Sequence, residues 1–231
     1  ETTVLDNPQQ MSDTVFSITP TVTGIQTLVT DRVAARINSQ SYAQLGSLAQ
    51  NAIQRKKDED GLTVLDGATT ILSGAGTTLA SGVIAAAAYR ISSNATEPGN
   101  PPYRAVLHGF QIKDLYDELT AAVSTAERSD ISGITARVFE EGFRGKIAGV
   151  EIFEDWNITI DSSTDDAKGG VFAQEAIVMV QGRAPRTATV RREDIGGGAT
   201  VVYLYDEYAY GERSAGNWLF EVQSDATAPT S

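Results

Sequence analysis

The 231-residue chain has no cysteine and a single histidine, His108. The absence of cysteine excludes disulfides, thiolate metal sites and cysteine nucleophiles, and one histidine argues against a zinc site. Long apolar runs are also missing: the longest, Gly82–Ile91, is interrupted by Arg90 and falls short of the ~20 residues that a membrane-spanning helix needs. The sequence therefore predicts no cofactor, no metal and no membrane contact.

Positive charge is scarce as well. The chain carries 18 Lys and Arg against 30 Asp and Glu, for a net charge of −12. Such a chain does not hold nucleic acid by general electrostatics. A wall that encloses nucleic acid without adhering to it would have this balance, as would many soluble proteins. The length and the 41% hydrophobic content allow one large or two modest domains with a real core.

No group of residues indicates catalysis. His108 ends an apolar segment and is interpreted as a hydrogen-bonded structural histidine, since no nucleophile or orienting acid can be assigned to it. The Asp161–Asp166 loop lacks the spacing of an EF-hand and is interpreted as a solvated turn. The Gly74–Gly76 fragment lacks the rest of a phosphate-binding loop. We therefore expect that the protein is not an enzyme.

An acid–base hydrolase is the weakest alternative. Two acidic pairs could serve as a glycosidase acid and base, but no sequence spacing fixes the separation that this chemistry requires. The pairs are Glu151 with Glu154 and Glu140 with Glu141.

The stretch Ser41–Asp60 predicts a long helix around which the chain is organised. Its apolar residues recur at steps of three and four, and Ser41 with Gln44 forms a capping box. The end is less clear, because Gly61 suits a stop while the helix could also continue to Leu65. The apolar stripe is narrow, and we expect the strand-rich later part of the chain to pack along it. The members of the stripe are Tyr42, Leu45, Leu48, Ala49, Ala52 and Ile53.

Before this helix, Asp13–Arg32 reads as two extended segments joined at Thr23-Gly24, a β-hairpin. Apolar residues fall on both of its faces. We expect the hairpin to lie on something else, either another copy of the chain or its own domain, and the residues leave both possibilities open. The preceding Glu1–Ser12 is polar. Glu1 suggests that upstream residues were cleaved off or are not included in this sequence, although a tag or a trimming artefact explains it equally well.

After the helix, helices and strands alternate and then strands dominate, which predicts an α+β protein. Helices are expected at 78–92 and 110–126, and strands at 104–108 and 146–153. Further strands are expected at 171–180, 187–192, 200–205 and 218–222, separated by the glycine-rich or charged segments DSSTDDAKGG, QGRAP, EDIGGG and YGERSAGN. The residues after Gln223 are expected to fray.

Arginines and tyrosines gather in this last third. Aromatic residues with arginine are typical of protein–protein interface cores, and core packing of a β domain is the alternative. For the arginines, pairing with acidic groups of neighbouring copies fits the charge balance better than binding of nucleic acid. The residues concerned are Arg183, Arg186, Arg191, Arg192, Tyr203, Tyr205, Tyr208, Tyr210 and Trp218.

The order of these parts resembles a known family, the HK97-type major capsid protein of tailed bacteriophages. Three segments carry the resemblance, which covers most of the chain after Asp13. They are PPYRAVLHGFQIKDLYDEL (Pro101–Leu119), GKIAGVEIFEDWNI (Gly145–Ile158) and GGVFAQEAIVMVQGRAPRTATVRRED (Gly169–Asp194). The resemblance implies an HK97-like capsid fold, with an extended E-loop hairpin, a long spine helix, a peripheral (P) domain and an axial (A) domain.

It also implies domain bounds. These are an N-terminal arm at 1–12, the E-loop at 13–36, the spine helix of the P domain at 37–67, the A domain at 68–177, a P-domain β segment at 178–223 and a tail at 224–231. Within the A domain, 124–143 would supply the loop at the capsomer centre. The first lysine is Lys56, so the lysine crosslink that some members form from the E-loop should be absent.

The implied function is structural. The chain would self-assemble into pentamers and hexamers of an icosahedral phage head around double-stranded DNA, in the bacterial host cytoplasm. Portal and scaffolding proteins, and a decoration protein, would be partners. An encapsulin-like nanocompartment shell and a monomeric β-rich binding module are the alternatives. The expected contacts between copies are Phe16, Ile18, Ile25, Leu28, Arg55, Lys56, Arg183, Arg186, Arg191, Arg192, Tyr208 and Tyr210.

Overall fold

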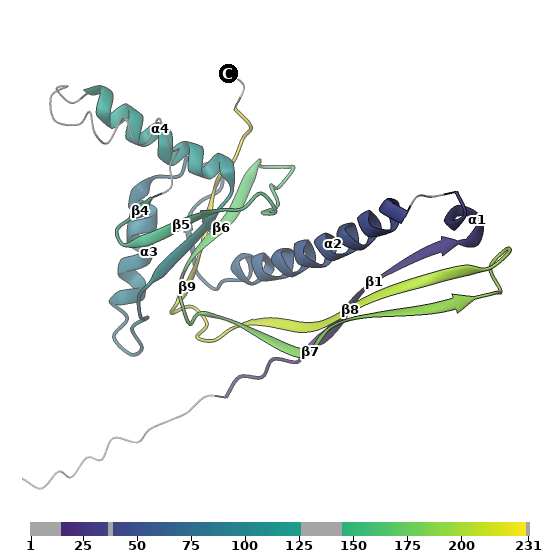
Figure 1. Cartoon of the computed structure of the whole chain (residues 1–231). Coiled ribbons are helices and arrows are strands. Elements are labelled where there is room, and N and C mark those ends of the chain that lie inside the picture. Colours follow the sequence, from purple (N-terminus) through teal and green to yellow (C-terminus); the bar gives the residue numbers. More distant parts are fainter. Residues whose placement is uncertain (1–14, 37–38, 126–144, 230–231) are drawn as a thin grey trace, which may run out of the picture.

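One long helix joins two sheets of different shape in the computed structural model, which describes residues 15–36, 39–125 and 145–229 (Figure 1). This helix, α2, spans the 28 residues Ser39–Asp66, about 42 Å at 1.5 Å per residue. It therefore continues past Asp60, as the sequence allowed. The acidic residues that obscured its end are paired one turn back, Arg55 with Glu59 at 2.9 Å and Lys56 with Asp60 at 2.6 Å.

The apolar stripe of α2 is only partly covered. Ile53 and Leu65 are buried, at 4% and 2% exposure, whereas Leu48 is 63% exposed and Ala52 is also exposed. The helix thus packs on its own chain along a narrow line. In the described residues no helix is long and apolar enough to cross a membrane.

The larger body is a six-stranded mixed sheet with two helices. Its strand order is β2-β9-β6-β3-β5-β4, with β2 parallel to β9, β3 parallel to β5 and the other pairs antiparallel. The strands are β2 (Ile71–Ser73), β3 (Tyr103–Leu107), β4 (Lys146–Ile147), β5 (Val150–Glu154), β6 (Asp166–Ala173) and β9 (Leu219–Asp225); the helices are α3 (Ser81–Ser92) and α4 (Gly109–Thr125). Both helices and the strand at 103–107 confirm the prediction within a few residues.

The main hydrophobic core lies in this body. It joins α3, α4 and the end of α2 to the sheet, through side chains such as Ile84, Leu115 and Leu65 packed with Val171 and Leu219. Burying such side chains supplies the main stabilising free energy of a domain.

A buried glutamine fixes the start of α4 in this core. The Nε2 of Gln111 donates to the carbonyl of Ala167 at 3.0 Å and to the Oγ of Ser224 at 2.8 Å, and its Oε1 accepts from the backbone N–H of His108 at 3.0 Å. Because a buried amide without partners is costly, this network holds α4 to β6 and β9 in one arrangement.

The second sheet is long and thin. Its order is β1-β8-β7, all antiparallel, and α2 lies along one of its faces (Figure 1). The strands are β1 (Thr21–Thr30), β7 (Ile177–Arg192) and β8 (Ala199–Glu212), and the short helix α1 (Asp31–Ala34) follows β1. Strands β7 and β8 form a hairpin through the predicted EDIGGG turn, which is confirmed.

The hairpin expected in Asp13–Arg32 is wrong. Residues 21–30 form one strand that pairs continuously with β8 and passes straight through Gly24. A Cβ at Gly24 would lie 3.0 Å from Cδ1 of Tyr205. The glycine is therefore where the Tyr205 ring crosses the strand, rather than a turn.

The turn expected at QGRAP is wrong for a related reason. Strand β7 continues through it, with register irregularities between Gln181 and Arg183 and between Arg183 and Arg186. A Cβ at Gly182 would lie 2.9 Å from the side chain of Glu207. Pro185 is tolerated because β7 is an edge strand. Glycine and proline mark a bulged edge here.

Three further boundaries differ from the prediction. Strand β9 of the six-stranded sheet continues to Asp225, and Ser224 and Ala226 are buried rather than frayed. The strand expected at 146–153 is two strands joined at Ala148 and Gly149, both with positive φ, and the one expected at 171–180 is split between β6 and β7. The arm at 1–12 and most of the expected capsomer loop lie outside the described residues.

Candidate intersubunit surface

A buried ion pair holds α2 on the long sheet. The Nζ of Lys57 lies 2.5 Å from the Oδ2 of Asp206 on β8, and the Asp206 side chain is fully buried. The ammonium also stands over the ring of Tyr208, 5.1 Å from its centroid. Neither Lys57 nor Asp206 was among the residues predicted from the sequence. The sequence of β8 could have indicated Asp206, because residues 206, 208 and 210 are two apart and so point to the same face of a strand as one another.

Tyr208 is an intramolecular residue, which corrects its assignment as a contact between copies. Its side chain is 3% exposed and its hydroxyl donates to the Oδ2 of Asp60 at 2.8 Å. Burial, together with this hydrogen bond, raises the pKa of Tyr208 to about 12. Tyr210 is half-buried on the same face, with its ring 3.8 Å from where a Cβ on Gly61 would stand, and burial raises its pKa too. Tyr208 therefore has almost no surface left for a neighbour, whereas Tyr210 keeps part of its surface exposed.

The opposite face of the long sheet points away from α2 and is here called the outer face. The registers of β1, β8 and β7 place five rows of side chains on it. The rows are Val22–Glu207–Arg183, Gly24–Tyr205–Arg186, Gln26–Tyr203–Ala188, Leu28–Val201–Val190 and Thr30–Ala199–Arg192. Each strand contributes every second residue, so aromatic, apolar and arginine side chains share one surface.

The two edge strands of the outer face carry exposed side chains in the described chain, whereas Val201 of the central strand is completely buried. Val22, Leu28 and Val190 are 67%, 42% and 47% exposed. The rings of Tyr203 and Tyr205 stack in parallel with centroids 5.6 Å apart. Exposed apolar groups next to stacked tyrosines are typical of surfaces that another protein covers.

The arginines predicted as contacts divide between two faces and hold acidic partners within the chain. Arg191 forms a bidentate pair with Asp31 of α1, with Nη1 2.7 Å from Oδ1, and Arg192 pairs with Asp194. Arg183 lies 3.4 Å from Glu207. Most of this cluster is therefore paired at the tip and edge of the sheet.

Arg186 differs from the other three arginines. Its guanidinium stands 5.3 Å from the ring centroid of Tyr205 on the outer face. With Arg183 and Val22 it lines a shallow cavity of about 260 Å³. This is the point of the outer face where arginine and aromatic groups occur together.

The remaining predicted contacts are scattered. Phe16 is 43% exposed, before β1, whereas Ile18 lies against Gly211 and Ile25 is half-buried on the α2 side of the sheet. Arg55 and Lys56 lie on the exposed side of α2, in the helical pairs given above. The structure thus gathers Leu28, Arg183, Arg186 and, at the tip, Arg192 on the outer face, and separates the others from it.

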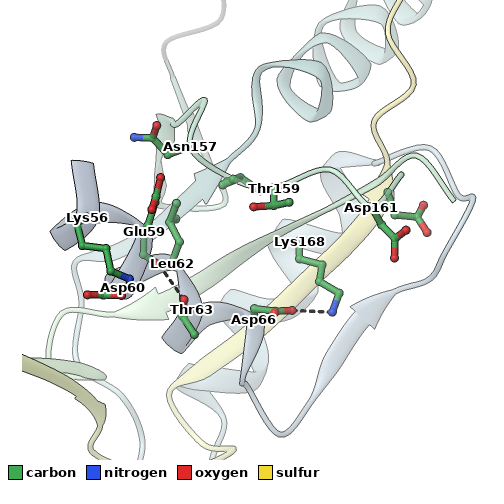
Figure 2. A pocket seen from close by; sticks show the side chains of 12 residues that line it. Lys56, Glu59, Asp60, Leu62, Thr63, Asp66, Asn157, Thr159, Asp161 and Lys168 are labelled. Atoms are coloured by element: carbon green, nitrogen blue, oxygen red, sulfur yellow. Dashed lines mark hydrogen bonds and ion pairs between the residues drawn. The ribbon is translucent and has the colours of Figure 1, made fainter. Parts of the chain in front are cut away.

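A groove runs between α2 and the start of β6 (Figure 2). Its volume is about 430 Å³, and Lys168 spans it to meet the Oδ1 of Asp66 at 2.6 Å. Behind it, Lys168 Nζ lies 3.9 Å from Glu221, a carboxyl that is 1% exposed and whose pKa burial raises. The lining residues are Lys56, Glu59, Asp60, Leu62, Thr63, Asp66, Asn157, Ile158, Thr159, Asp161, Asp166 and Lys168.

The side chains that line the groove bond mainly to one another and to the chain itself. Among the described residues no group of His, Asp and Glu is arranged to hold a metal ion. The Oδ1 of Asp161 accepts from the backbone and hydroxyl of Ser163, which is the bonding of a turn. Five of the twelve lining residues are acidic, and two of these, Asp60 and Asp66, pair with Lys56 and Lys168. The groove therefore has the bonding of a contact between α2 and the body.

His108 is structural, as predicted. It is 4% exposed, its Nδ1 accepts from the backbone N–H of Phe110 at 3.2 Å, and burial lowers its pKa. Its ring meets Phe110 and Trp156 edge-on, with centroids 4.9 and 5.0 Å away. Of the two glutamate pairs, Glu151 is bound to Lys146 at 2.7 Å, and 140–141 lie outside the described residues.

No protein-family model and no curated protein sequence matches this chain. Solved structures match it by fold. The capsid of the cyanophage P-SCSP1u matches with a TM-score of 0.67 at 12% identity, covering 98% of this chain and 81% of that one. A structure of Mycobacterium phage Che8 matches at 0.64 and 18% identity, covering 92% and 76%. The SrpI encapsulin complex of Synechococcus elongatus matches at 0.64 and 11% identity, covering 92% and 76%.

At these identities the likeness establishes the fold. The predicted α+β fold of the HK97 capsid type is confirmed, with its long helix, its compact mixed sheet and its long thin sheet.

Proposed function

We propose that this chain is a major capsid protein that assembles into the pentamers and hexamers of an icosahedral phage head around double-stranded DNA. The observation that carries the proposal is the long sheet with α2. The chain that contains them matches a capsid structure over 98% of its length, and these elements leave Leu48, Val22 and Val190 uncovered, from 47% to 67% exposed. Such exposure is costly in a lone protein and expected of a subunit.

The mechanism is assembly without catalysis. The body supplies a folded unit, and the long sheet with α2 supplies surface for neighbouring copies. Each contact can be modest, because a closed shell repeats it many times and every subunit is held by several neighbours. The net charge of −12 keeps the wall from adhering to the enclosed DNA.

The partners follow from this role. The chain contacts other copies of itself, and portal and scaffolding proteins, with or without a decoration protein, complete the head. Assembly takes place in the bacterial host cytoplasm and the product is the virion. Leu28, Arg183 and Arg186 on the outer face, together with Phe16, Arg55 and Lys56 at the surface, are the contacts we retain. Arg191 and Arg192 act instead within the chain, on Asp31 and Asp194.

The test is the size of the purified protein, measured by sedimentation and negative-stain imaging, with and without the scaffolding protein of the same source. Rings or closed shells in both preparations, or only with scaffold, support the proposal. A protein that stays at its 24.6 kDa monomer mass in both contradicts it.

An encapsulin-like nanocompartment is the second candidate, and the match to the Synechococcus elongatus encapsulin complex supports it. The two shells differ in content. Particles isolated from the native source would hold nuclease-protected DNA if they are phage heads, and protein cargo without DNA if they are nanocompartments.

A further inference from the structure

The long sheet has two free edges, and the chain treats them differently. In the described residues β7 and β1 each pair only with β8. A free strand edge invites pairing with another chain, and proteins block it with charge, proline or bulges. Strand β7 has all three: arginines, Pro185 and two register irregularities between Gln181 and Arg186. It is a protected edge.

Strand β1 has none of these protections. Its sequence, TVTGIQTLVT, contains no charged residue and no proline, and its ten residues pair with β8 without a bulge. Threonine, valine and isoleucine favour extended structure. Half of its backbone N–H and C=O groups point away from β8, as in any antiparallel edge. The edge of β1 is therefore free to form backbone hydrogen bonds with a strand of another chain.

We infer that the β1 edge pairs with the β1 edge of a second copy of this chain, antiparallel and around a two-fold axis, to join two long sheets into one. This inference rests on the proposed shell function only for the supply of neighbouring copies. Pairing of β1 with the β7 edge of another copy is disfavoured, because the bulges and Pro185 interrupt that ladder. Two identical uncharged edges meet without repulsion between like charges.

The side chains select one register. Residues directly opposite each other in an antiparallel pair share a face. With Ile25 opposite Ile25 of the second copy, Val22 stands opposite Leu28 and Thr23 opposite Thr27. The exposed Val22 and Leu28, at 67% and 42%, would then cover each other twice on the outer face. Shifting the centre to Gly24 or Gln26 loses this apolar pair.

Cysteine crosslinking tests the register, and the absence of native cysteine makes each crosslink unambiguous. Directly opposite residues have Cα atoms within disulfide range. Under assembly conditions, Ile25→Cys should form disulfide dimers. Val22→Cys and Leu28→Cys should form them only when the two variants are mixed. Val190→Cys on β7, 47% exposed against 42% for Leu28, is the matched control and should form none.

Charge variants test the same pairing without a covalent bond. Val22→Lys with Leu28→Lys places like charges opposite each other and should abolish the contact, whereas Val22→Glu with Leu28→Lys should retain it. Within one chain the ranking is reversed, because position 22 lies beside Glu207 of β8, which favours lysine there. If the substitutions act on folding, the variant with Val22→Glu should be the less stable of the two. If they act on pairing between copies, the variant with Val22→Lys should be the one that loses the dimer contact.

The outcomes separate this inference from the proposed function. Shells that form normally, with no dimer from Ile25→Cys or from the mixture, overturn the β1 pairing and leave the shell intact. Dimers in the predicted register from a protein that builds no shell support the pairing and contradict the shell. A monomer that gives no dimer at any concentration overturns both. Dimers from Val190→Cys in place of Ile25→Cys assign the contact to β7 and overturn the inference.

Discussion

The body and the long sheet are stabilised in different ways. In the six-stranded body, side chains such as Leu107, Val150 and Leu219 are completely buried among helices and strands of the same chain. The long sheet has α2 on one face only, attached by the Lys57–Asp206 ion pair, and its outer face carries exposed Val22 and Leu28. A domain that completes its own core folds alone, whereas a thin sheet with one covered face depends on what covers the other.

The largest expected effect is the loss of a core side chain in the body. Leu107→Ala removes a side chain with no exposed surface and leaves a cavity, so the free energy of unfolding should fall by about 2–5 kcal/mol. Leu48→Ala is the matched control on α2, where 63% of the side chain is exposed, and should change it by less than about 0.5 kcal/mol. Denaturant unfolding measures both. Equal losses would show that α2 is as well packed as the body.

The second effect concerns the attachment of α2. Asp206→Ala leaves Lys57 without its counter-ion in a largely buried place, which should cost about 1.5–3 kcal/mol. Asp194→Ala, which breaks the exposed pair with Arg192, should cost only about 0–1 kcal/mol.

Hydrogen exchange shows where that loss falls. In Asp206→Ala the amides of β1 and β8 should lose protection while those of β6 and β9 keep it, because only the long sheet is released. Equal loss in both sheets would mean that the two regions unfold as one unit.

The same contrast explains which predictions from the sequence succeeded. Periodicity located α3, α4 and α2, because a helix that packs on its own chain needs a regular apolar stripe. It failed at Gly24 and Gly182, where glycine makes room for Tyr205 and Glu207 of a neighbouring strand. A glycine in a close approach looks like a glycine in a turn until the partner strand is known.

The candidate surface was predicted less well than the fold. The gathering of arginine and tyrosine pointed to β7 and β8, and Arg186 with Tyr205 does form part of an exposed face. Strand register, which sequence does not reveal, decides which face each residue joins. Successive residues of a strand point to opposite faces. Tyr208 therefore lies on the α2 side, where it bonds Asp60, and Tyr205 lies on the outer face.

A third prediction concerns pH and the junction of α2 with the body. Burial raises the pKa of Glu221 above its usual 4.5, so the folded state holds this proton more tightly than the unfolded chain. Its contribution to stability is complete below the unfolded pKa and declines as the pH rises through the folded pKa. Glu221→Gln should therefore raise the melting temperature relative to the wild type at pH 7 and lose that advantage near pH 4. An advantage of the same size at both pH values would contradict a raised pKa of Glu221.

The smallest effect isolates one hydrogen bond between α2 and the long sheet. Tyr208→Phe removes the hydroxyl that donates to Asp60 but keeps the buried ring under Lys57, so unfolding should become easier by about 0.5–1.5 kcal/mol. Tyr89→Phe, on a side chain that is 66% exposed in the body, is the control and should change nothing measurable. If Tyr208→Phe were also neutral, the packing of the ring and the Lys57–Asp206 pair would suffice to hold α2, and the asymmetry between the two sheets would rest on charge and packing alone.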